Sequence, residues 1–254
     1  MKITKFKKTS KDKYKIFLEN GETLTLYEDV ILNNRLILTK ELDEELKDKI
    51  LEENDDRHVY GMAINYLSIR IRSIKEMEEY LYKKGISKSL IDKTIDKLIR
   101  NGYLNDFTFA KSYINDQLIL TNNGPYKIKN NLIKLGINDD IINEAMEDID
   151  NNIVKEKLSN LMEKQIRIKK GSSSALKIKL LNYFYNLGYD KEDIIYELNN
   201  SNIKTDLDKL KKEYDKLYSR YKNKYEGYEL ETFIERKLIQ KGYKKDEIKK
   251  INTD

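Results

Sequence analysis

The hexapeptide Leu-Tyr-Lys-Lys-Gly-Ile at residues 81–86 sets a pattern that returns three times along the chain. It reappears as Leu-Ile-Lys-Leu-Gly-Ile at 132–137, Phe-Tyr-Asn-Leu-Gly-Tyr at 184–189 and Leu-Ile-Gln-Lys-Gly-Tyr at 238–243. The four glycines are spaced 51, 52 and 54 residues apart, and an isoleucine follows each of them six residues later. Such self-similarity at a nearly fixed period is typical of a tandem array of small modules.

Each repeat predicts a helix that ends at its glycine and a second helix that begins just after it. Glycine favours the left-handed conformation that closes a helix, and the apolar residue that follows it covers the helix end. Ser87, Asn138 and Asp190 stand where a side chain can cap the next helix. In the first repeat we expect three helices, over about 57–71, 73–84 and 87–101.

Two short motifs predict where the helix that ends at the glycine begins. Ser73-Ile-Lys-Glu76 has the form of a capping box, in which the serine and the glutamate satisfy each other's backbone N–H groups. Gly124-Pro125 places a proline at the first position of the corresponding helix in the second repeat, where its missing N–H has no cost.

The first 40 or so residues predict a different, β-rich structure that contains a hairpin. Residues 14–19 and 22–27 alternate in polarity and flank Asn20-Gly21, a dipeptide that favours a type I′ turn with positive φ at both positions. Residues 3–8 can add a third strand. Because an isolated hairpin is only marginally stable, we expect it to pack on the helices that follow.

Composition fits an array of thin cores better than one thick globule. Of 254 residues, 39% are hydrophobic and 37% are charged, and the single proline favours long helices. The predicted fold is mostly α: tandem three-helix units in an elongated curved array, with a small N-terminal β-hairpin region. The predicted divisions are 1–56 (hairpin and a linking helix), 57–104, 105–150, 151–200 and 201–254, the last being the least regular.

Catalytic and metal-binding patterns are sparse, so we expect a protein that is not an enzyme and has no cofactor. There is no cysteine, and His58 is the only histidine, which makes a surface or helix-capping role the simplest one for it. No glycine-rich phosphate-binding loop occurs. No apolar run is long enough to span a membrane, and the N-terminus has no apolar core typical of a signal peptide, so a cytoplasmic protein is expected.

Clusters of basic residues are the better candidates for a functional site. One cluster flanks the loop at Gly171 and consists of Lys164, Arg167, Lys169, Lys170, Lys177 and Lys179. Positive charge gathered on both sides of a loop can bind phosphates or acidic side chains, although a solvated helix face is the simpler explanation of such a charge run. Arg70 and Arg72 form a second group, for which ion pairing with Glu76 or Glu79 is the structural alternative.

The 19 tyrosines admit two interpretations. Aromatic rings on a surface can stack with unpaired bases, as they do in proteins that bind single strands. Most of these tyrosines lie at helical core spacing, however, so we expect most of them to pack in the interior.

Three motifs in a fixed order resemble those of the RecX family. They are Arg70-Ile-Arg72-Ser73-Ile-Lys-Glu76, Gly102-Tyr-Leu-Asn-Asp106-Phe-Thr-Phe109-Ala110 and Gly124-Pro125-Tyr-Lys-Ile128. The resemblance is firm over residues 60–150 and looser beyond them. Two departures concern charge: Asn130-Asn131 stand where the family commonly has a basic residue, and residues 104–150 carry 4 basic against 8 acidic side chains.

The resemblance implies a regulator of the RecA recombinase. Such a protein would bind in the groove of the filament that RecA forms on single-stranded DNA and limit its ATPase, strand-exchange and coprotease activities. Its implied partners are the RecA filament and, more weakly, single- and double-stranded DNA, with the protein itself a monomer. A modular body with several separated patches suits such a long partner, because many weak contacts add through effective concentration.

Two other classes of function remain open from the residues alone. The chain can be a general DNA-binding helical-repeat protein that acts without RecA through the basic loop around Gly171, or a helical scaffold for an unrelated protein. Steep salt dependence of DNA binding, without any effect on RecA, would favour the former.

Overall fold

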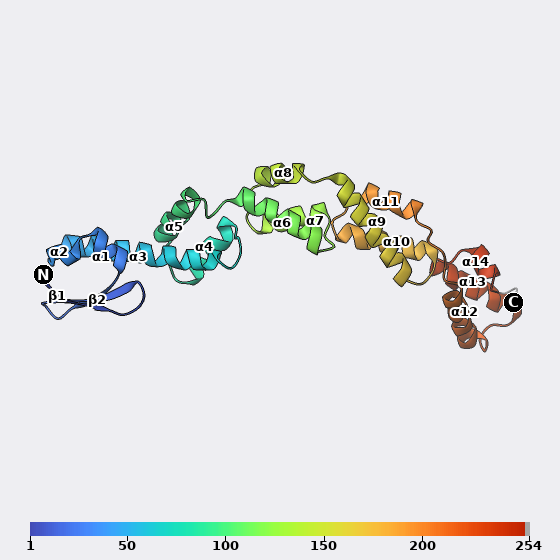
Figure 1. Ribbon diagram of the computed structural model, residues 1–254. Helices are drawn as coiled ribbons and strands as arrows, with labels where there is room; N and C mark the ends of the chain where they lie inside the picture. Colours follow the sequence, from blue (N-terminus) through green and yellow to red (C-terminus); the bar gives the residue numbers. More distant parts are fainter. Residues whose placement is uncertain (252–254) are drawn as a thin grey trace. The chain divides into compact units, whose positions relative to one another are not determined.

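The computed structural model describes residues 1–251, and it is mostly helical with a small sheet at its N-terminal end (Figure 1). It divides into two compact units. The N-terminal unit comprises Met1–Phe109 with Leu135–Ile137, and the C-terminal unit comprises Ala110–Lys134 and the chain from Asn138 onward. This confirms the mostly α fold with an N-terminal β region.

The sheet has three antiparallel strands in the order β1 (Ile3–Lys8), β2 (Lys13–Leu18) and β3 (Thr23–Tyr27). Its apolar side chains alternate, so that one face is buried and the other faces solvent. Ile16 lies opposite Leu24 in the ladder, and both are buried. The predicted hairpin and its third strand are therefore confirmed.

The hairpin turn differs in type from the predicted one. Of the two residues in Asn20-Gly21, only Gly21 has a positive φ, of 83°. The Leu18 N–H donates to the Glu22 carbonyl oxygen at 2.9 Å. Three residues therefore form the loop, with glycine in the left-handed position of a bulge that matches the strand twist. Asn20 keeps a negative φ because its amide oxygen accepts from the Glu22 N–H at 3.0 Å.

The sheet packs on the helices that follow it, as predicted, but it ends at Tyr27, and residues 28–39, which were expected to be β, form helices instead. These are α1 (Glu28–Asn33), α2 (Leu36–Thr39) and the beginning of α3 (Glu44–Leu67). One core contains Ile16, Leu26, Ile31, Leu36 and Ile50, which join the strands to all three helices.

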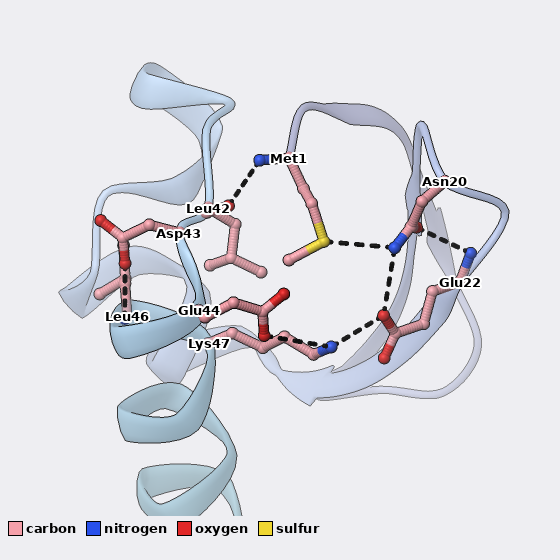
Figure 2. A network of polar contacts seen from close by, with 8 residues as sticks. All are labelled: Met1, Asn20, Glu22, Leu42, Asp43, Glu44, Leu46 and Lys47. Carbon is pink, nitrogen blue, oxygen red and sulfur yellow. Dashed lines mark hydrogen bonds and ion pairs between the residues drawn. The ribbon is translucent and has the colours of Figure 1, made fainter.

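Polar contacts fasten the turn to the start of α3 (Figure 2). Lys47 donates to Glu22 at 2.8 Å, and this hydrogen bond lowers the pKa of the Glu22 carboxyl and raises the pKa of Lys47. The N-terminal ammonium group donates to the Leu42 carbonyl oxygen at 2.8 Å, and Asp43 caps α3 by accepting from the Leu46 N–H at 2.7 Å.

Helix α3 corrects the expectation of two separate helices on either side of residue 57. Residues 44–67 form one continuous helix, so the linking helix and the first helix of the first repeat are a single element. No proline stands near residue 56 to stop the helix, and Gly61 is accommodated within it. The helix ends at Leu67, before the expected residue 71, because Ser73 must leave the helical conformation to cap the next helix, where its φ is −73° and its ψ 160°.

The remaining helices follow in order along the chain. They are α4 (Ile74–Lys83), α5 (Lys88–Arg100), α6 (Asp106–Leu120), α7 (Pro125–Lys134), α8 (Asp139–Glu147), α9 (Asn151–Ile168), α10 (Ser173–Asn186), α11 (Lys191–Asn200), α12 (Leu207–Tyr221), α13 (Gly227–Gln240) and α14 (Lys245–Lys249). Separate cores join α3 to α4 and α5, α9 to α10 and α11, and α12 to α13 and α14. The division of the chain at 57, 105, 151 and 201 stays a prediction.

The four repeated glycines end α4, α7, α10 and α13, which we call the middle helices. Their φ angles are 79°, 84°, 85° and 89°, which confirms the predicted left-handed helix ends. In α10 the N–H of Tyr189 donates to the Phe184 carbonyl oxygen at 3.2 Å, the contact expected when glycine closes a helix in this way.

In the C-terminal unit, the middle helices α7, α10 and α13 meet head to tail, an arrangement that the sequence did not reveal. The Gly124 N–H before α7 donates to Leu187 O at 2.7 Å, and the Ser172 hydroxyl before α10 donates to Lys241 O at 3.3 Å. Each of these two contacts joins the positive end of one helix dipole to the negative end of the next. Within the N-terminal unit, the Ser73 hydroxyl before α4 donates to the Leu135 carbonyl oxygen at 2.9 Å.

Candidate functional site

Within the described residues, no three histidine, cysteine or acidic side chains form a group that could hold a metal ion. His58 lies exposed on α3, and its Nδ1 atom is 2.9 Å from the Tyr27 hydroxyl. No helix between residues 1 and 251 is both long and apolar enough to cross a membrane. The basic clusters are therefore the strongest candidates for a site.

Arg70 and Arg72 both face Glu76 at the start of α4. Arg70 donates to both carboxylate oxygens of Glu76, and Arg72 lies 3.8 Å from one of them. The Arg72 guanidinium also lies 4.1 Å from the centre of the Tyr66 ring, which stacks on Tyr80 at 3.9 Å. The structure therefore favours the ion-pair interpretation of this group, although Arg70 keeps about half of its side chain exposed.

The loop between α9 and α10 is held rigidly by its backbone. The Gly171 carbonyl oxygen accepts from the Asp206 N–H at 3.0 Å, and the Ser173 N–H donates to the Thr205 hydroxyl at 2.9 Å. Ser172, which is buried, caps α10 by accepting from the Ala175 N–H at 3.1 Å. The lysines beside this loop therefore project from a fixed backbone.

A groove of about 560 Å³ lies beside this loop, and five lysines line it. They are Lys169, Lys170, Lys179, Lys209 and Lys241. Glu213 is the one acidic residue in the lining, so the groove carries a formal charge of +4. We call it the basic groove.

The contacts of these lysines leave most of their charge unopposed. Lys241 pairs with Glu213, and this hydrogen bond lowers the pKa of the Glu213 carboxyl. Lys170 lies 3.9 Å from Asp206, a loose contact, and the Lys209 ammonium donates to the Lys170 carbonyl oxygen at 3.1 Å. The Lys169 ammonium lies 4.8 Å from the centre of the Tyr183 ring. Such a set of cations can bind a chain of phosphates and release its counterions.

The structure brings together only part of the predicted set. Lys169, Lys170 and Lys179 line the basic groove, whereas Lys164, Arg167 and Lys177 do not. Arg167 pairs with Glu163 one turn away on α9, at 3.2 Å, as expected of a solvated helix face.

Sequence reasoning missed Lys209 and Lys241, which come from α12 and from the end of α13. Lys241 stands directly before Gly242, the glycine that ends α13. In the structure this helix end meets the start of α10, which brings Lys241 to the groove. Without the head-to-tail contact of the middle helices, nothing linked Lys241 to a loop seventy residues earlier.

Comparison with known proteins assigns the chain to a family. The family profile described as "RecX, first three-helix domain" matches residues 60–98, and "RecX, second three-helix domain" matches residues 105–146. The regulatory protein RecX of Streptococcus uberis is 31% identical over an alignment 259 residues long, which covers 100% of this chain and 99% of that protein. The regulatory protein RecX of Bacillus mycoides is 28% identical, over 97% of this chain and 95% of that one.

Two solved structures agree with this assignment. A crystal structure of a regulatory protein RecX shares the fold, with a TM-score of 0.67 over 79% of this chain and 99% of that one, at 20% identity. The crystal structure of RecX from Lactobacillus salivarius is 30% identical, with a TM-score of 0.54 over 58% of this chain and 97% of that one. The full-length identity, the two matched domains and the shared fold together establish that this chain belongs to the RecX family.

Proposed function

We propose that this chain regulates the RecA recombinase as a binding protein and not as an enzyme. It binds within the groove of the RecA–single-stranded DNA filament and limits the ATPase, strand-exchange and coprotease activities of RecA. The observation that carries this proposal is the match over the whole chain to a protein named as a regulatory protein RecX.

The basic groove supports this function because a nucleoprotein filament is a polyanion. Its five lysines can contact phosphates of the bound DNA or acidic side chains of the recombinase. Contacts at several places along the chain add through effective concentration, so no single patch has to bind tightly.

Co-sedimentation with preformed RecA filaments tests the proposal. The chain should pellet with the filaments and stay in solution with RecA alone at the same concentration. Raising the salt should weaken the binding, because the encounter is electrostatic. Equal recovery in the supernatant with and without filaments would overturn the proposal.

A charge-reversal variant tests whether the basic groove contributes to filament binding. Lys170→Glu, Lys179→Glu and Lys209→Glu together should weaken filament binding about tenfold or more, because they remove three cations from the groove and add three anions. Lys211→Glu, Lys212→Glu and Lys216→Glu on the exposed side of α12 change the net charge equally and are the matched control. Equal weakening by both variants would mean that only net charge matters.

A second candidate function is DNA binding without RecA. The observation that favours it is the +4 formal charge of the basic groove. Under this alternative, the chain binds duplex and single-stranded DNA with a steep salt dependence and leaves RecA activity unchanged. Tight binding to DNA together with unchanged ATP turnover by RecA filaments would identify this second function.

A further inference from the structure

A second groove, of about 580 Å³, lies in the C-terminal unit where the start of α7 meets the end of α10. Two exposed tyrosines from different helices line it, Tyr126 from the first turn of α7 and Tyr185 from the last turn of α10, together with the buried Tyr189. Tyr126 and Tyr185 each keep 59% of their surface exposed. We call it the tyrosine groove.

Backbone hydrogen bonds fix the two tyrosines relative to each other. The Tyr126 N–H donates to the Gly188 carbonyl oxygen at 3.0 Å, three residues after Tyr185. The neighbouring Gly124 N–H donates to Leu187 O at 2.7 Å. The backbone beneath the two rings is thus held in place, so a ligand has to order only their side chains.

The charge of the tyrosine groove suits an anionic ligand. Lys127 and Lys191 line it, and neither forms an ion pair with another residue in the described part of the chain. The nearby carboxylate of Asp190 already caps α11, where it accepts from the Glu192 N–H at 2.7 Å and the Asp193 N–H at 3.3 Å. The two cations are therefore available to a ligand, and Asn130 adds a polar side chain.

We propose that the tyrosine groove binds single-stranded nucleic acid, with unpaired bases stacked on Tyr126 and Tyr185 and the backbone phosphates held by Lys127 and Lys191. Exposed aromatic rings combined with cations are the features with which proteins bind single strands independently of sequence. A duplex cannot use this groove in the same way, because its bases are already stacked on one another. The site needs no recombinase, so it stands apart from the proposed regulation of RecA.

Fluorescence anisotropy with labelled oligo(dT), in the absence of RecA, tests the site. Tyr126→Ala with Tyr185→Ala should weaken binding about tenfold or more, since base stacking is lost, while binding of a duplex of equal length stays within about twofold. Tyr126→Phe with Tyr185→Phe should bind like the parent, because phenylalanine keeps the stacking face. The control is Tyr196→Ala with Tyr228→Ala, two exposed rings outside the groove.

A salt titration tests the two lysines independently of the rings. Lys127→Gln with Lys191→Gln should reduce the slope of log affinity against log salt by about 1.4, the value for two single-strand phosphate contacts. A labelled oligo(U) arm identifies the sugar: tighter binding than oligo(dT) assigns RNA as the ligand, and weaker binding assigns DNA.

Unchanged oligo(dT) affinity in the alanine pair, with its helical circular dichroism intact, would overturn the inference. So would equal weakening by the control pair. If the double variant loses helicity, Tyr126→Ala and Tyr185→Ala measured singly decide, because each ring is more than half exposed. None of these outcomes bears on filament binding, so this inference can fail while the RecA proposal stands.

Discussion

At the scale of single residues, Tyr189 is an unusual component of the C-terminal unit. Its side chain is 2% exposed, its hydroxyl has no hydrogen-bond partner among the described residues, and burial raises the pKa of Tyr189 to about 12. The ring packs edge-on against Phe184, with centroids 5.9 Å apart. The ring therefore stabilises the core, whereas the hydroxyl opposes folding.

Tyr189→Phe should leave the free energy of unfolding unchanged or raise it by about 1 kcal/mol, because only an unpaired buried hydroxyl is removed. Tyr189→Ala, which also removes the ring, should lower it by about 3–5 kcal/mol. Urea denaturation followed by circular dichroism measures both. A loss of more than about 1 kcal/mol in the phenylalanine variant would show that the hydroxyl has a hydrogen-bond partner in solution.

Asp106 holds the start of α4 from a distant position in the chain. Its carboxylate accepts from the Ile74 N–H at 2.9 Å. Burial raises the pKa of Asp106 above its ordinary value of 3.8, and the hydrogen bond from Ile74 partly offsets this. The folded state thus binds this proton more tightly than the unfolded state, so the side chain stabilises most below pH 3.8 and less as pH rises through its folded pKa.

Asp106→Asn should therefore keep or raise the free energy of unfolding at neutral pH, because the amide oxygen can still accept and no charge is buried. Its advantage over the parent should shrink as the solution is acidified. Asp106→Ala should cost about 1–2 kcal/mol, since the Ile74 N–H loses its acceptor. Denaturation curves at neutral and acid pH measure these differences. An asparagine variant that is as unstable as the alanine variant at neutral pH would contradict this explanation.

Local residue roles could be predicted from sequence where both partners are close along the chain. Ser73 and Glu76 form the predicted capping box because the motif contains both partners. Asp106 could not be assigned to α4, because it lies 32 residues after Ile74 and no spacing rule joins them. Ser87 stands at the predicted N-cap position of α5, but its side chain makes no capping hydrogen bond.

At the scale of elements, two of the repeated glycines differ in what surrounds them. Gly85 and Gly188 have nearly equal φ angles, 79° and 85°. A Cβ atom at Gly85 would meet nothing within 4 Å, whereas one at Gly188 would lie 2.3 Å from the Lys127 backbone nitrogen. Gly85 therefore serves only to end α4, whereas Gly188 also permits the close contact between α10 and α7.

Gly85→Ala should cost about 1–2 kcal/mol in unfolding free energy, the penalty of a left-handed non-glycine residue. Gly188→Ala should cost clearly more, because the backbones of two helices must also separate. Thermal or urea unfolding of the two variants makes the comparison. Equal losses would mean that the contact between α7 and α10 contributes little to stability.

The elements themselves were largely predictable, and their contacts were not. The glycine repeat predicted where α4, α7, α10 and α13 end, because helix termination is a local matter of φ and capping. The continuity of α3 through residue 57 was missed, because the linking helix and the first helix of the repeat were treated as separate elements. The head-to-tail meeting of the middle helices depends on three-dimensional packing, which the repeat period alone does not encode.

At the scale of the whole molecule, the repeated cores predict an elongated monomer, since modules stacked in series contact only their neighbours. Small-angle scattering should give a radius of gyration well above the ~18 Å of a compact chain of this length. If scattering gives the mass of a single chain and a radius of gyration near that of a compact chain, the prediction of an elongated array of modules is contradicted.

The functional site was predictable only in part. The lysines beside Gly171 drew attention because they are neighbours in sequence, yet the basic groove also needs Lys209 and Lys241 from later helices. Tyr126 and Tyr185 could not be told from core tyrosines, because exposure depends on which face of a helix the neighbouring modules cover.

The rate of ATP hydrolysis by preformed RecA–single-stranded DNA filaments, with this chain titrated in, tests the central claim most directly. We predict that turnover falls when there is less than one chain per RecA subunit, because one chain in the filament groove restrains several subunits. Inhibition should weaken as salt rises and in the Lys170→Glu, Lys179→Glu and Lys209→Glu variant, but not in the variant changed at Lys211, Lys212 and Lys216. Unchanged ATP turnover with chain in excess over RecA would contradict the account.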